Sequence, residues 1–332
     1  MPKVIVAMSG GVDSSVAAAI LKNRGYDVVG VFMLMHKNSN PQDAKAVARK
    51  LKIDFKVLDV RKEFKKRVID YFVKEYNSGN TPNPCVECNK HIKFKFLIDI
   101  ATKLKADFIT TGHYAKIKGS KLFIAKDTKK DQSYFLWQLN QKQLSKIIFP
   151  LGDYTKEQVG GLAKKFRLPV FGKKESQDIC FTLPRRSPDK IGAKAGLIIT
   201  IKGEKVGEHK GLSFYTIGQR KGLPATPASW LAWRAGNPVY VVKKDLKKNA
   251  LIISKSEKDL LSKEIIVKDM NWLSDKPYNG KYKVKIRSTA KMADAKIKGN
   301  KITFTKSQRA ITPGQSAVFY KNSEILGGGI IS

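Results

Sequence analysis

The first 35 residues alternate between apolar runs and one amphipathic stretch. Residues 3–8 and 28–35 are apolar, residues 12–23 place apolar side chains at helical spacing, and Gly25 ends that stretch. Short apolar runs are typical of buried strands, and a helical period between two of them predicts a strand–helix–strand unit. The pattern indicates that the chain begins as an α/β fold.

The same alternation continues to about residue 111. It predicts helices over residues 41–51, 60–76 and 92–104, and strands over 55–58 and 108–111. Strands separated by helices of ten or more residues form parallel sheets with both faces covered. We therefore expect a parallel sheet with helices on both faces.

Residues 77–89 interrupt this pattern. Their sequence, Asn-Ser-Gly-Asn-Thr-Pro-Asn-Pro-Cys-Val-Glu-Cys-Asn, is rich in residues that form turns. We expect neither helix nor strand there. Loops between regular elements often carry function, so the segment is predicted to be a functional loop.

Beyond about residue 200 the apolar runs become short and turn residues become frequent. Short strands are predicted over residues 239–242, 250–254, 265–269, 282–287, 301–305, 317–320 and 325–329. Closely spaced short strands favour a small barrel or sandwich. Because 332 residues exceed what one core usually holds, we expect domain boundaries near residues 190–200 and near residue 255.

The charge of the chain adds a further constraint. There are 64 Lys and Arg against 28 Asp and Glu, a formal net charge of +36. Such a surplus repels itself in the folded state, and its usual use is to bind a polyanion, a nucleic acid first and an anionic membrane surface second. Lysines spread along the chain also fit a general compositional bias, so charge alone does not name the partner.

A membrane helix needs roughly 18 consecutive apolar residues, and no apolar run in the sequence is that long. We therefore expect a cytoplasmic protein that does not span a membrane.

The segment Ser9-Gly-Gly-Val-Asp-Ser-Ser15 follows the first predicted strand and opens the first predicted helix. Glycines let the backbone approach an anion, and serine hydroxyls and the N–H groups at a helix start donate to phosphate. The segment lacks the Gly-Lys-Ser/Thr of a Walker loop and the third glycine of a dinucleotide fingerprint. A simple glycine turn capped by Asp13 does not require serines on both sides, so a phosphate-binding loop is predicted.

Three cysteines provide the other chemical signal. Cys85 and Cys88 are separated by two residues, and Cys180 lies far along the chain. In a reducing compartment this spacing indicates redox chemistry or a metal more often than a structural disulfide. Taken alone, Cys180 between Ile179 and Phe181 is typical of a buried core thiol. Beside a Cys-x-x-Cys pair it becomes a candidate for sulfur chemistry.

The glycine-rich segment resembles the PP-loop of the ATP pyrophosphatases, which adenylate an oxygen atom and release pyrophosphate. Further segments resemble the bacterial tRNA-specific 2-thiouridylases of that superfamily: Thr81–Phe94, Thr111–Ala115, Lys130–Leu136, Gly207–Leu212 with Tyr215–Gly222, and Thr312–Tyr320. The resemblance extends from residue 3 to about residue 330. It implies a PP-loop domain with a parallel sheet (1–195), a small α+β central domain (196–256) and a C-terminal β-barrel domain (257–332).

The resemblance also implies an activity. Members of this family use ATP to activate the C2 oxygen of the wobble uridine in lysine, glutamate and glutamine tRNAs, and then replace it with sulfur. Cys88 corresponds to the nucleophile and Cys180 to the carrier of the persulfide, with a transient Cys88–Cys180 disulfide. ATP and Mg²⁺ are the implied cofactors. The implied partners are tRNA and a persulfide donor such as a cysteine desulfurase or a sulfur-relay protein.

Binding residues follow from the same resemblance. Those expected to hold ATP are Ala7, Met8, Ser9, Gly10, Gly11, Val12, Asp13, Ser14, Met33 and Gly112. Those expected to contact the target base are Asn83, Pro84 and Cys85, and those expected to contact other parts of the tRNA are His113, Lys130, Asp131, Gln132, Arg287, Ser288 and Gln315. A histidine after a strand is more often structural, but open α/β sheets bind ligands at the strand ends where His113 is predicted.

Nearby lysines bear on the reactivity of the thiols. Lys90, Lys93 and Lys173-Lys174 are close to the cysteines in the sequence. A neighbouring cation favours the thiolate, so we expect one of them to lower a cysteine pKa.

One position departs from the family pattern. Cys85 stands where many members have Asp, which leaves the acid/base role of that Asp open here. Three thiolates can instead bind a [4Fe-4S] cluster on Cys85, Cys88 and Cys180 with one iron open to sulfide, and zinc with His91 as fourth ligand is a less favoured possibility. We favour the persulfide relay over the cluster.

Two other classes of function stay open. A different PP-loop enzyme, such as an amidotransferase-type synthetase acting on a small molecule, would need neither cysteine nor tRNA. A tRNA-binding protein without catalysis would bind its RNA whether or not ATP is present.

Overall fold

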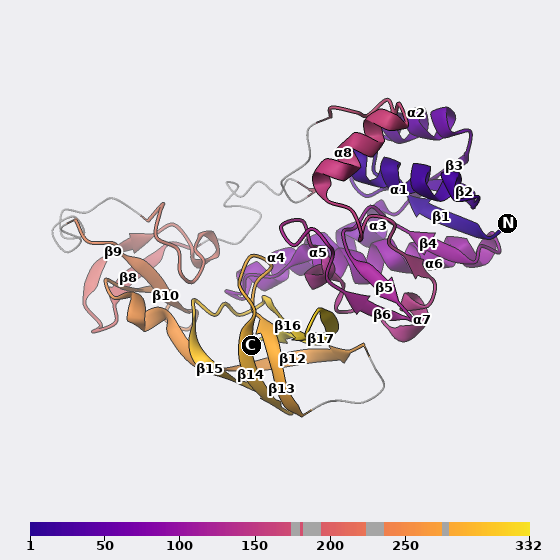
Figure 1. The fold of residues 1–332 in the computed structure, drawn as a ribbon. Helices are drawn as coiled ribbons and strands as arrows, with labels where there is room; N and C mark the ends of the chain where they lie inside the picture. Colours follow the sequence, from indigo (N-terminus) through magenta and orange to yellow (C-terminus); the bar gives the residue numbers. More distant parts are fainter. Residues whose placement is uncertain (174–179, 182–193, 224–235, 274–278) are drawn as a thin grey trace.

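The computed structural model describes residues 1–173, 180–181, 194–223, 236–273 and 279–332. Figure 1 shows an α/β region formed by the N-terminal half of the chain, a small β region, and a β-barrel that contains the C-terminus. None of the described helices is long and apolar enough to cross a membrane.

The N-terminal sheet has five parallel strands in the order β3-β2-β1-β4-β7. They are β1 (Lys3–Ala7), β2 (Asp27–Leu34), β3 (Asp54–Asp59), β4 (Phe108–Thr110) and β7 (Ile147–Ile148). Strand β1 pairs with β2 on one side and β4 on the other, and Val4, Ile5 and Val6 are fully buried. The apolar run at the start of the chain is therefore the centre of the sheet.

Helices cover both faces of this sheet (Figure 1). They are α1 (Val12–Asn23), α2 (Gln42–Leu51), α3 (Arg61–Phe64), α4 (Asp70–Asn77), α5 (Pro84–Cys88), α6 (Phe94–Lys103), α7 (Gln141–Leu144) and α8 (Lys156–Lys165). Val4 and Val6 pack in a core with α1, α2 and α8, whereas Ile5 packs in a second core with α3, α4 and α6. Because alternate side chains of a strand point to opposite faces, each face of the sheet packs against its own set of helices. The prediction of a parallel sheet with helices on both faces is confirmed.

The helical stretches 61–77 and 84–103 each contain one π-helical turn, called a π-turn below. Residues 65–69 form one between α3 and α4, and residues 89–93 form another between α5 and α6. Each turn adds one residue to a helical circuit, so it changes which side chains share a face.

The prediction that residues 77–89 form neither helix nor strand is wrong from Pro84 onward. The side chain of Asn83 accepts a hydrogen bond from the N–H of Cys85 at 3.2 Å, and Pro84 occupies the first position of α5. Asparagine at an N-cap followed by proline starts a helix. The turn-forming residues here therefore mark the beginning of a helix rather than a continuous loop.

The C-terminal region is a closed antiparallel barrel. Its strands are β12 (Leu261–Trp272), β13 (Gly280–Lys285), β14 (Ala293–Lys298), β15 (Lys301–Arg309), β16 (Ser316–Lys321) and β17 (Glu324–Ile331). They pair in the order β12-β15-β14-β13-β16-β17, and β12 also pairs with β17. The predicted barrel is confirmed.

The central region has a sheet of its own. Strands β8 (Gly196–Thr200), β9 (Lys205–His209), β10 (Tyr240–Asp245) and β11 (Ala250–Ser254) pair in the order β10-β11-β8-β9. Ile198, Val241, Leu251 and Ile253 are fully buried in its core. A short 3₁₀ turn, Leu212–Phe214, is the helical element that this region shows among its described residues.

A hairpin of the N-terminal region joins the barrel. Strands β5 (Lys116–Lys118) and β6 (Lys121–Phe123) pair with each other, and β6 pairs with β17 through Leu122 and Ile325. The backbone ladder of the barrel therefore continues into the first region, and no sequence pattern predicted this hairpin.

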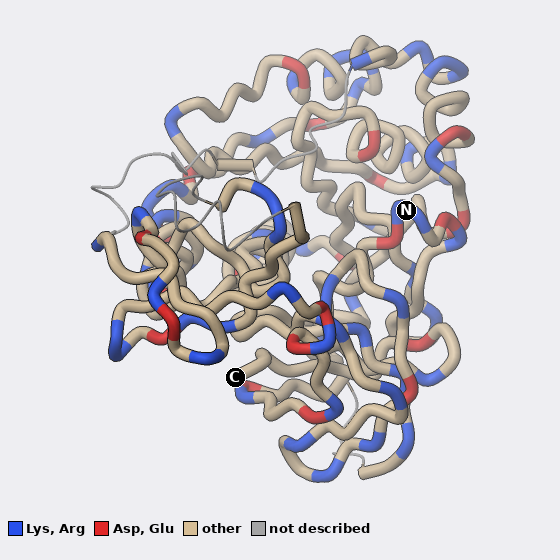
Figure 2. The backbone as a smooth tube through the Cα atoms, turned by 90° about the vertical axis from the view of Figure 1, so that its left-hand side faces the viewer, with Lys and Arg blue, Asp and Glu red and all other residues tan. Residues whose placement is uncertain are grey.

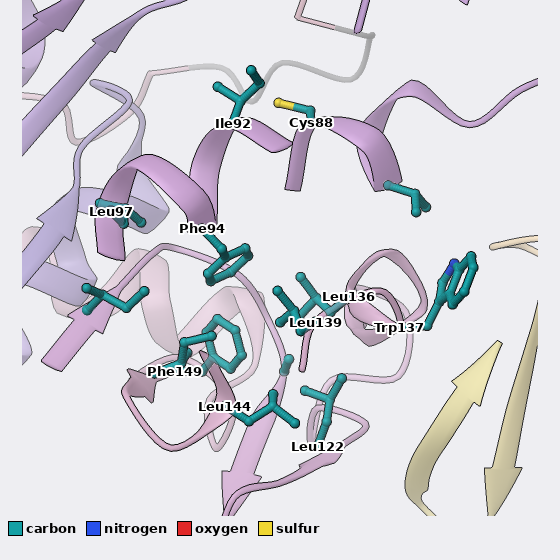
Figure 3. Close-up of a cluster of buried hydrophobic side chains, with 14 of the residues drawn as sticks. Cys88, Ile92, Phe94, Leu97, Leu122, Leu136, Trp137, Leu139, Leu144 and Phe149 are labelled. Carbon is teal, nitrogen blue, oxygen red and sulfur yellow. The ribbon is translucent and has the colours of Figure 1, made fainter. Parts of the chain in front are cut away.

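Trp137 also packs where the N-terminal region meets the barrel, a contact called the junction below. It is fully buried, its indole N–H donates to the Ser316 hydroxyl at 3.0 Å, and Asn271 donates to the Trp137 carbonyl at 2.7 Å. A Cβ at Gly328 would lie 2.8 Å from the indole, so β17 approaches the ring as closely as glycine allows. Figure 3 shows Trp137 on the side of the core that faces the barrel strands.

Replacing Trp137 should loosen this junction. We expect Trp137→Ala to lower the free energy of unfolding by about 3–5 kcal/mol, because it leaves a large cavity and an unpaired Ser316 hydroxyl. Equilibrium denaturation measures the change, with Phe171→Ala as the control, since Phe171 is 54% exposed. A loss for Trp137→Ala no larger than for the control would contradict this role.

Candidate functional site

A cavity of about 510 Å³ opens at the carboxyl ends of β1, β2 and β4. Residues from the predicted ATP site line it: Ala7, Met8, Ser9, Asp13, Ser14, Met33 and Gly112. His113, Gln132 and Cys180, which were predicted for tRNA contact and sulfur transfer, line the same cavity. The structure therefore brings residues from five separate segments of the chain together.

Two glycines shape the loop at the base of the cavity. Gly10 has a φ of +78°, and a Cβ there would lie 3.0 Å from the Cβ of Asp43. At Gly112 a Cβ would lie 2.6 Å from the backbone nitrogen of Ser14. Glycine at both positions lets the end of β4 and the start of α2 pack directly against the loop.

Hydrogen bonds within the loop fix its serines. The Ser14 hydroxyl accepts from the Ser9 N–H at 3.1 Å, and the Ser15 hydroxyl donates to the Gly11 carbonyl at 2.8 Å. Backbone donors and hydroxyls at the start of α1 are thus gathered at one point, as an anion-binding loop requires.

The carboxylate of Asp13 is held from two sides. The Lys156 ammonium lies 2.7 Å from Oδ1 and 2.8 Å from Oδ2, and the Tyr114 hydroxyl donates to Oδ1 at 2.9 Å. Lys156 was not singled out from the sequence. The Thr155…Gln158 capping box is a sequence signal for the start of the helix that contains Lys156. It does not predict a contact with a residue 143 positions earlier in the chain.

His113 is buried beside two aromatic rings that also contact each other. Its ring centroid lies 6.0 Å from that of Phe94 and 6.2 Å from that of Phe149, and its Nδ1 lies 2.6 Å from the Thr111 hydroxyl oxygen. Burial, helped by the charge of Lys93, holds the pKa of His113 well below its usual range. The imidazole is therefore neutral at physiological pH and offers hydrogen bonds rather than a charge.

The three thiols differ in exposure. Cys88 is buried, Cys85 is half-buried and Cys180 is exposed. Burial raises the pKa of Cys85 and of Cys180, and it raises the pKa of Cys88 to about 12. The ammonium of Lys93 lowers the pKa of each thiol, but by less than burial raises it. The prediction that a nearby lysine lowers a cysteine pKa is confirmed for Lys93, but the pKa of each thiol is raised overall because burial has the larger effect.

Lys173 contacts the glycine-rich loop and α2. Its ammonium contacts the carboxylate of Asp43 and lies 3.5 Å from the Gly10 carbonyl oxygen, while Lys174 lies outside the described residues.

The π-turn explains how Lys93 reaches the thiols. Phe94 donates its N–H to the carbonyl of Asn89, five residues earlier, rather than to that of Lys90. In an α-helix the fifth residue after Cys88 would point about 140° away from it. The wider turn brings that residue, Lys93, back toward the face of Cys88, and Lys93 also lines the cavity.

Several residues predicted to contact tRNA make internal contacts. Asp131 accepts from the N–H of Ala125 at 2.9 Å and from the Ser133 hydroxyl at 2.8 Å, so it shapes its own loop. Gln132 accepts from the N–H of Tyr114 at 3.0 Å. Lys130 lies beside them and is partly exposed.

Arg287 bridges the barrel and the central region. Its guanidinium donates to the carbonyls of Ile217 at 3.2 Å and Ala310 at 2.5 Å, and to the Thr312 hydroxyl. Its neighbour Ser288 is partly exposed. Arg287 therefore holds two parts of the fold together and does not reach the cavity.

Gln315, immediately before β16, contacts the segment that leads into α5. Its amide donates to the Thr81 carbonyl at 2.7 Å, and Gly314 packs against Asn80 and Thr81. The barrel thus supports the segment of Asn83, buried Pro84 and Cys85.

The thiols do not form a metal site as they are placed here. Among the described residues, which include all three cysteines and His91, no three His, Cys, Asp or Glu side chains are arranged to hold a metal ion. This arrangement does not fit the iron–sulfur cluster or the zinc site considered from the sequence.

Comparison with known proteins identifies the family. A tRNA-specific 2-thiouridylase MnmA 2 of Clostridium botulinum is 43% identical over 355 residues, covering 99% of this chain and 98% of the relative. The chain belongs to the tRNA-specific 2-thiouridylase family. A second 2-thiouridylase, from Clostridium perfringens, is 41% identical over 362 residues with the same coverage.

Family models divide this 2-thiouridylase-family chain into three parts. A tRNA methyl transferase HUP domain matches residues 2–183, a tRNA methyl transferase PRC-barrel domain matches 188–255, and an aminomethyltransferase beta-barrel domain matches 262–331. These parts correspond to the parallel-sheet region, the central sheet and the closed barrel.

The thiols should react slowly at neutral pH. Because the pKa of each thiol is raised, each thiol is mostly protonated at pH 7. The rate of alkylation should therefore rise about tenfold per pH unit at pH values below the pKa. We expect iodoacetamide, followed by mass spectrometry, to label Cys180 first, Cys85 next and buried Cys88 last.

The effect of Lys93 can be separated in the same assay. Lys93→Met should slow alkylation of Cys180 at pH 8 several-fold, by roughly 3 to 10 times, because a favourable cation is removed. Lys95→Met is the matched control, since Lys95 is an exposed lysine two residues further along the chain. Equal rates in the two variants would contradict the assigned influence of Lys93.

Proposed function

We propose that this protein catalyses the ATP-dependent 2-thiolation of the wobble uridine in lysine, glutamate and glutamine tRNAs. One observation carries the proposal: the glycine-rich loop and Cys180 line the same cavity. An enzyme that activates an oxygen with ATP and then replaces it with sulfur needs both groups within reach of one atom. Membership of the 2-thiouridylase family agrees with this chemistry.

The first step is activation of the uridine. The C2 oxygen attacks the α-phosphorus of ATP, pyrophosphate leaves, and the oxygen becomes part of an adenylate. The backbone and hydroxyl donors of Ser9, Gly10, Gly11 and Ser14 would hold the phosphates, with Ala7, Met8, Val12, Met33 and Gly112 around the nucleotide. Adenylation turns a poor leaving oxygen into AMP.

The second step transfers sulfur. The terminal sulfur of a Cys180 persulfide attacks C2, and AMP leaves with the original oxygen. Cys88 then attacks the Sγ of Cys180, which breaks the S–S bond to the transferred sulfur and leaves 2-thiouridine with a Cys88–Cys180 disulfide. The two thiols supply the two electrons, and an external dithiol restores them. Lys93 would favour the thiolates that these attacks require.

Contacts with tRNA would lie around the cavity and along the barrel. Asn83, Pro84 and Cys85 would meet the target base, and His113 and Gln132 border the cavity in which that base reacts. Further contacts are proposed at Lys130–Asp131, Arg287–Ser288 and Gln315. Figure 2 shows lysine and arginine distributed over all three regions rather than gathered on one, which suits a large polyanion.

Mg²⁺ and a sulfur donor complete the proposal. Mg²⁺ keeps several waters and usually binds through phosphates. Asp13 is the one carboxylate among the described residues that line the cavity, and the Lys156 ammonium contacts both of its oxygens, so phosphate oxygens and water would hold the ion. When bound, Mg²⁺ would reduce the charge of the triphosphate. Cys180 is exposed, so a protein persulfide donor such as a cysteine desulfurase or a sulfur-relay protein can reach it.

Substitution of the two cysteines tests the sulfur relay. We expect Cys180→Ser and Cys88→Ser each to reduce 2-thiouridine formation at least 100-fold in an assay with ATP, a persulfide donor and lysine tRNA. Nucleoside analysis by mass spectrometry measures the product. Each variant should keep tRNA-dependent ATP–pyrophosphate exchange, because activation of the oxygen does not use the thiols.

The same experiment separates the other classes of function. Full thiolation by Cys180→Ser would overturn the role of that residue. Exchange without tRNA but with a small-molecule acceptor, unaffected by replacement of all three cysteines, would favour a different PP-loop enzyme. Binding of tRNA without any exchange would favour a non-catalytic binding protein.

Iron content tests the cluster alternative. We expect protein prepared without oxygen to contain well under one iron per chain and to show no visible absorption band, because the described thiols are not arranged as a metal site. About four irons per chain, lost together with activity in Cys85→Ser, would overturn the persulfide relay in favour of a [4Fe-4S] cluster.

A further inference from the structure

The glycine-rich loop carries an acid close to where the phosphates of ATP are proposed to bind. Asp13 lies within the loop, and its side chain lines the cavity. The loop itself, residues 9–15, contains no lysine or arginine. An unpaired carboxylate repels a triphosphate at this range, so the loop needs a cation from another part of the chain.

Lys156 provides that cation. Its ammonium contacts both oxygens of the Asp13 carboxylate, at 2.7 and 2.8 Å, and the side chains of Lys156 and Asp13 are 30% and 23% exposed. Contacts this short between a cation and both carboxylate oxygens are strong hydrogen bonds. The negative charge of Asp13 is therefore neutralised at the loop.

The start of a helix holds Lys156 in place. It is the first residue of α8, and its backbone N–H donates to the Asp127 carboxylate at 3.0 Å. Thr155 and Gln158 form a capping box around it, and the ammonium lies 5.9 Å from the centre of the Tyr114 ring. Such contacts reduce the freedom that a long lysine side chain would otherwise have.

We propose that Lys156 is a positioning residue that neutralises Asp13 and so allows the PP-loop to accept an anionic nucleotide. The inference rests on the proposed function, because it requires a triphosphate in this cavity. Lys156 acts through Asp13 and needs no contact with ATP of its own.

ATP affinity of the full-length protein tests this role. Isothermal titration with ATP and Mg²⁺ should show Lys156→Met binding about tenfold more weakly than the unsubstituted protein, because the Asp13 carboxylate is left unpaired. Lys156→Arg should keep most of the affinity. Lys165→Met is the matched control, since Lys165 is an exposed lysine of the same helix, and it should bind ATP normally.

A second substitution separates charge from folding. Asp13→Asn combined with Lys156→Met should bind ATP several-fold more tightly than Lys156→Met alone, because a neutral amide does not repel phosphate. A purely structural role of Lys156 predicts no such recovery. Thermal unfolding of each variant shows that the comparison is made on folded protein.

The outcomes also separate this inference from the proposed function. Normal ATP binding by Lys156→Met, or a double variant as weak as Lys156→Met, would overturn the inference alone. Failure of the unsubstituted protein to bind ATP would overturn both.

Discussion

Parallel pairing of β1 with β2 and β4 is the constraint on which the site depends. Because all three strands run in one direction, the segments that follow them meet at a single edge of the sheet. The absence of a side chain at Gly112 lets the segment after β4 contact the backbone of Ser14. A larger residue there would separate the phosphate-binding loop from His113 and from the rest of the cavity.

Burial and charge act against each other at the thiols. The same enclosure that shields a reactive sulfur from water raises its pKa, and Lys93 opposes that effect without overcoming it. A protonated resting thiol is less readily oxidised than a thiolate. Persulfides are more acidic than thiols in general chemistry, so the proposed persulfide on Cys180 would itself supply the anion that the resting thiol lacks. The π-turn before α6 is the local feature that places Lys93 where its charge acts on all three thiols.

Paired charges organise much of a protein with a net charge of +36. Lys156 pairs with Asp13 at the loop, Asp131 accepts a hydrogen bond from the N–H of Ala125, and Asp127 accepts one from the N–H of Lys156. The guanidinium of Arg287 donates hydrogen bonds to carbonyls of two regions instead of facing solvent. The few acidic side chains near the site are thus occupied in fixing geometry, which leaves the surplus of lysines at the surface for a polyanion.

The sequence by itself determined the parallel α/β region, the change to short strands after residue 200, and the glycine-rich loop, because strand and helix periods and loop chemistry are local properties. It misjudged residues 84–89, where the signals for a turn and for a helix start use the same residues. The hairpin β5–β6 on the barrel, the contact of Lys156 with Asp13, and the placement of Cys180 beside the loop came from the tertiary structure alone. These contacts join segments more than a hundred residues apart, and no local pattern specifies which distant side chains the packing of a sheet will bring together.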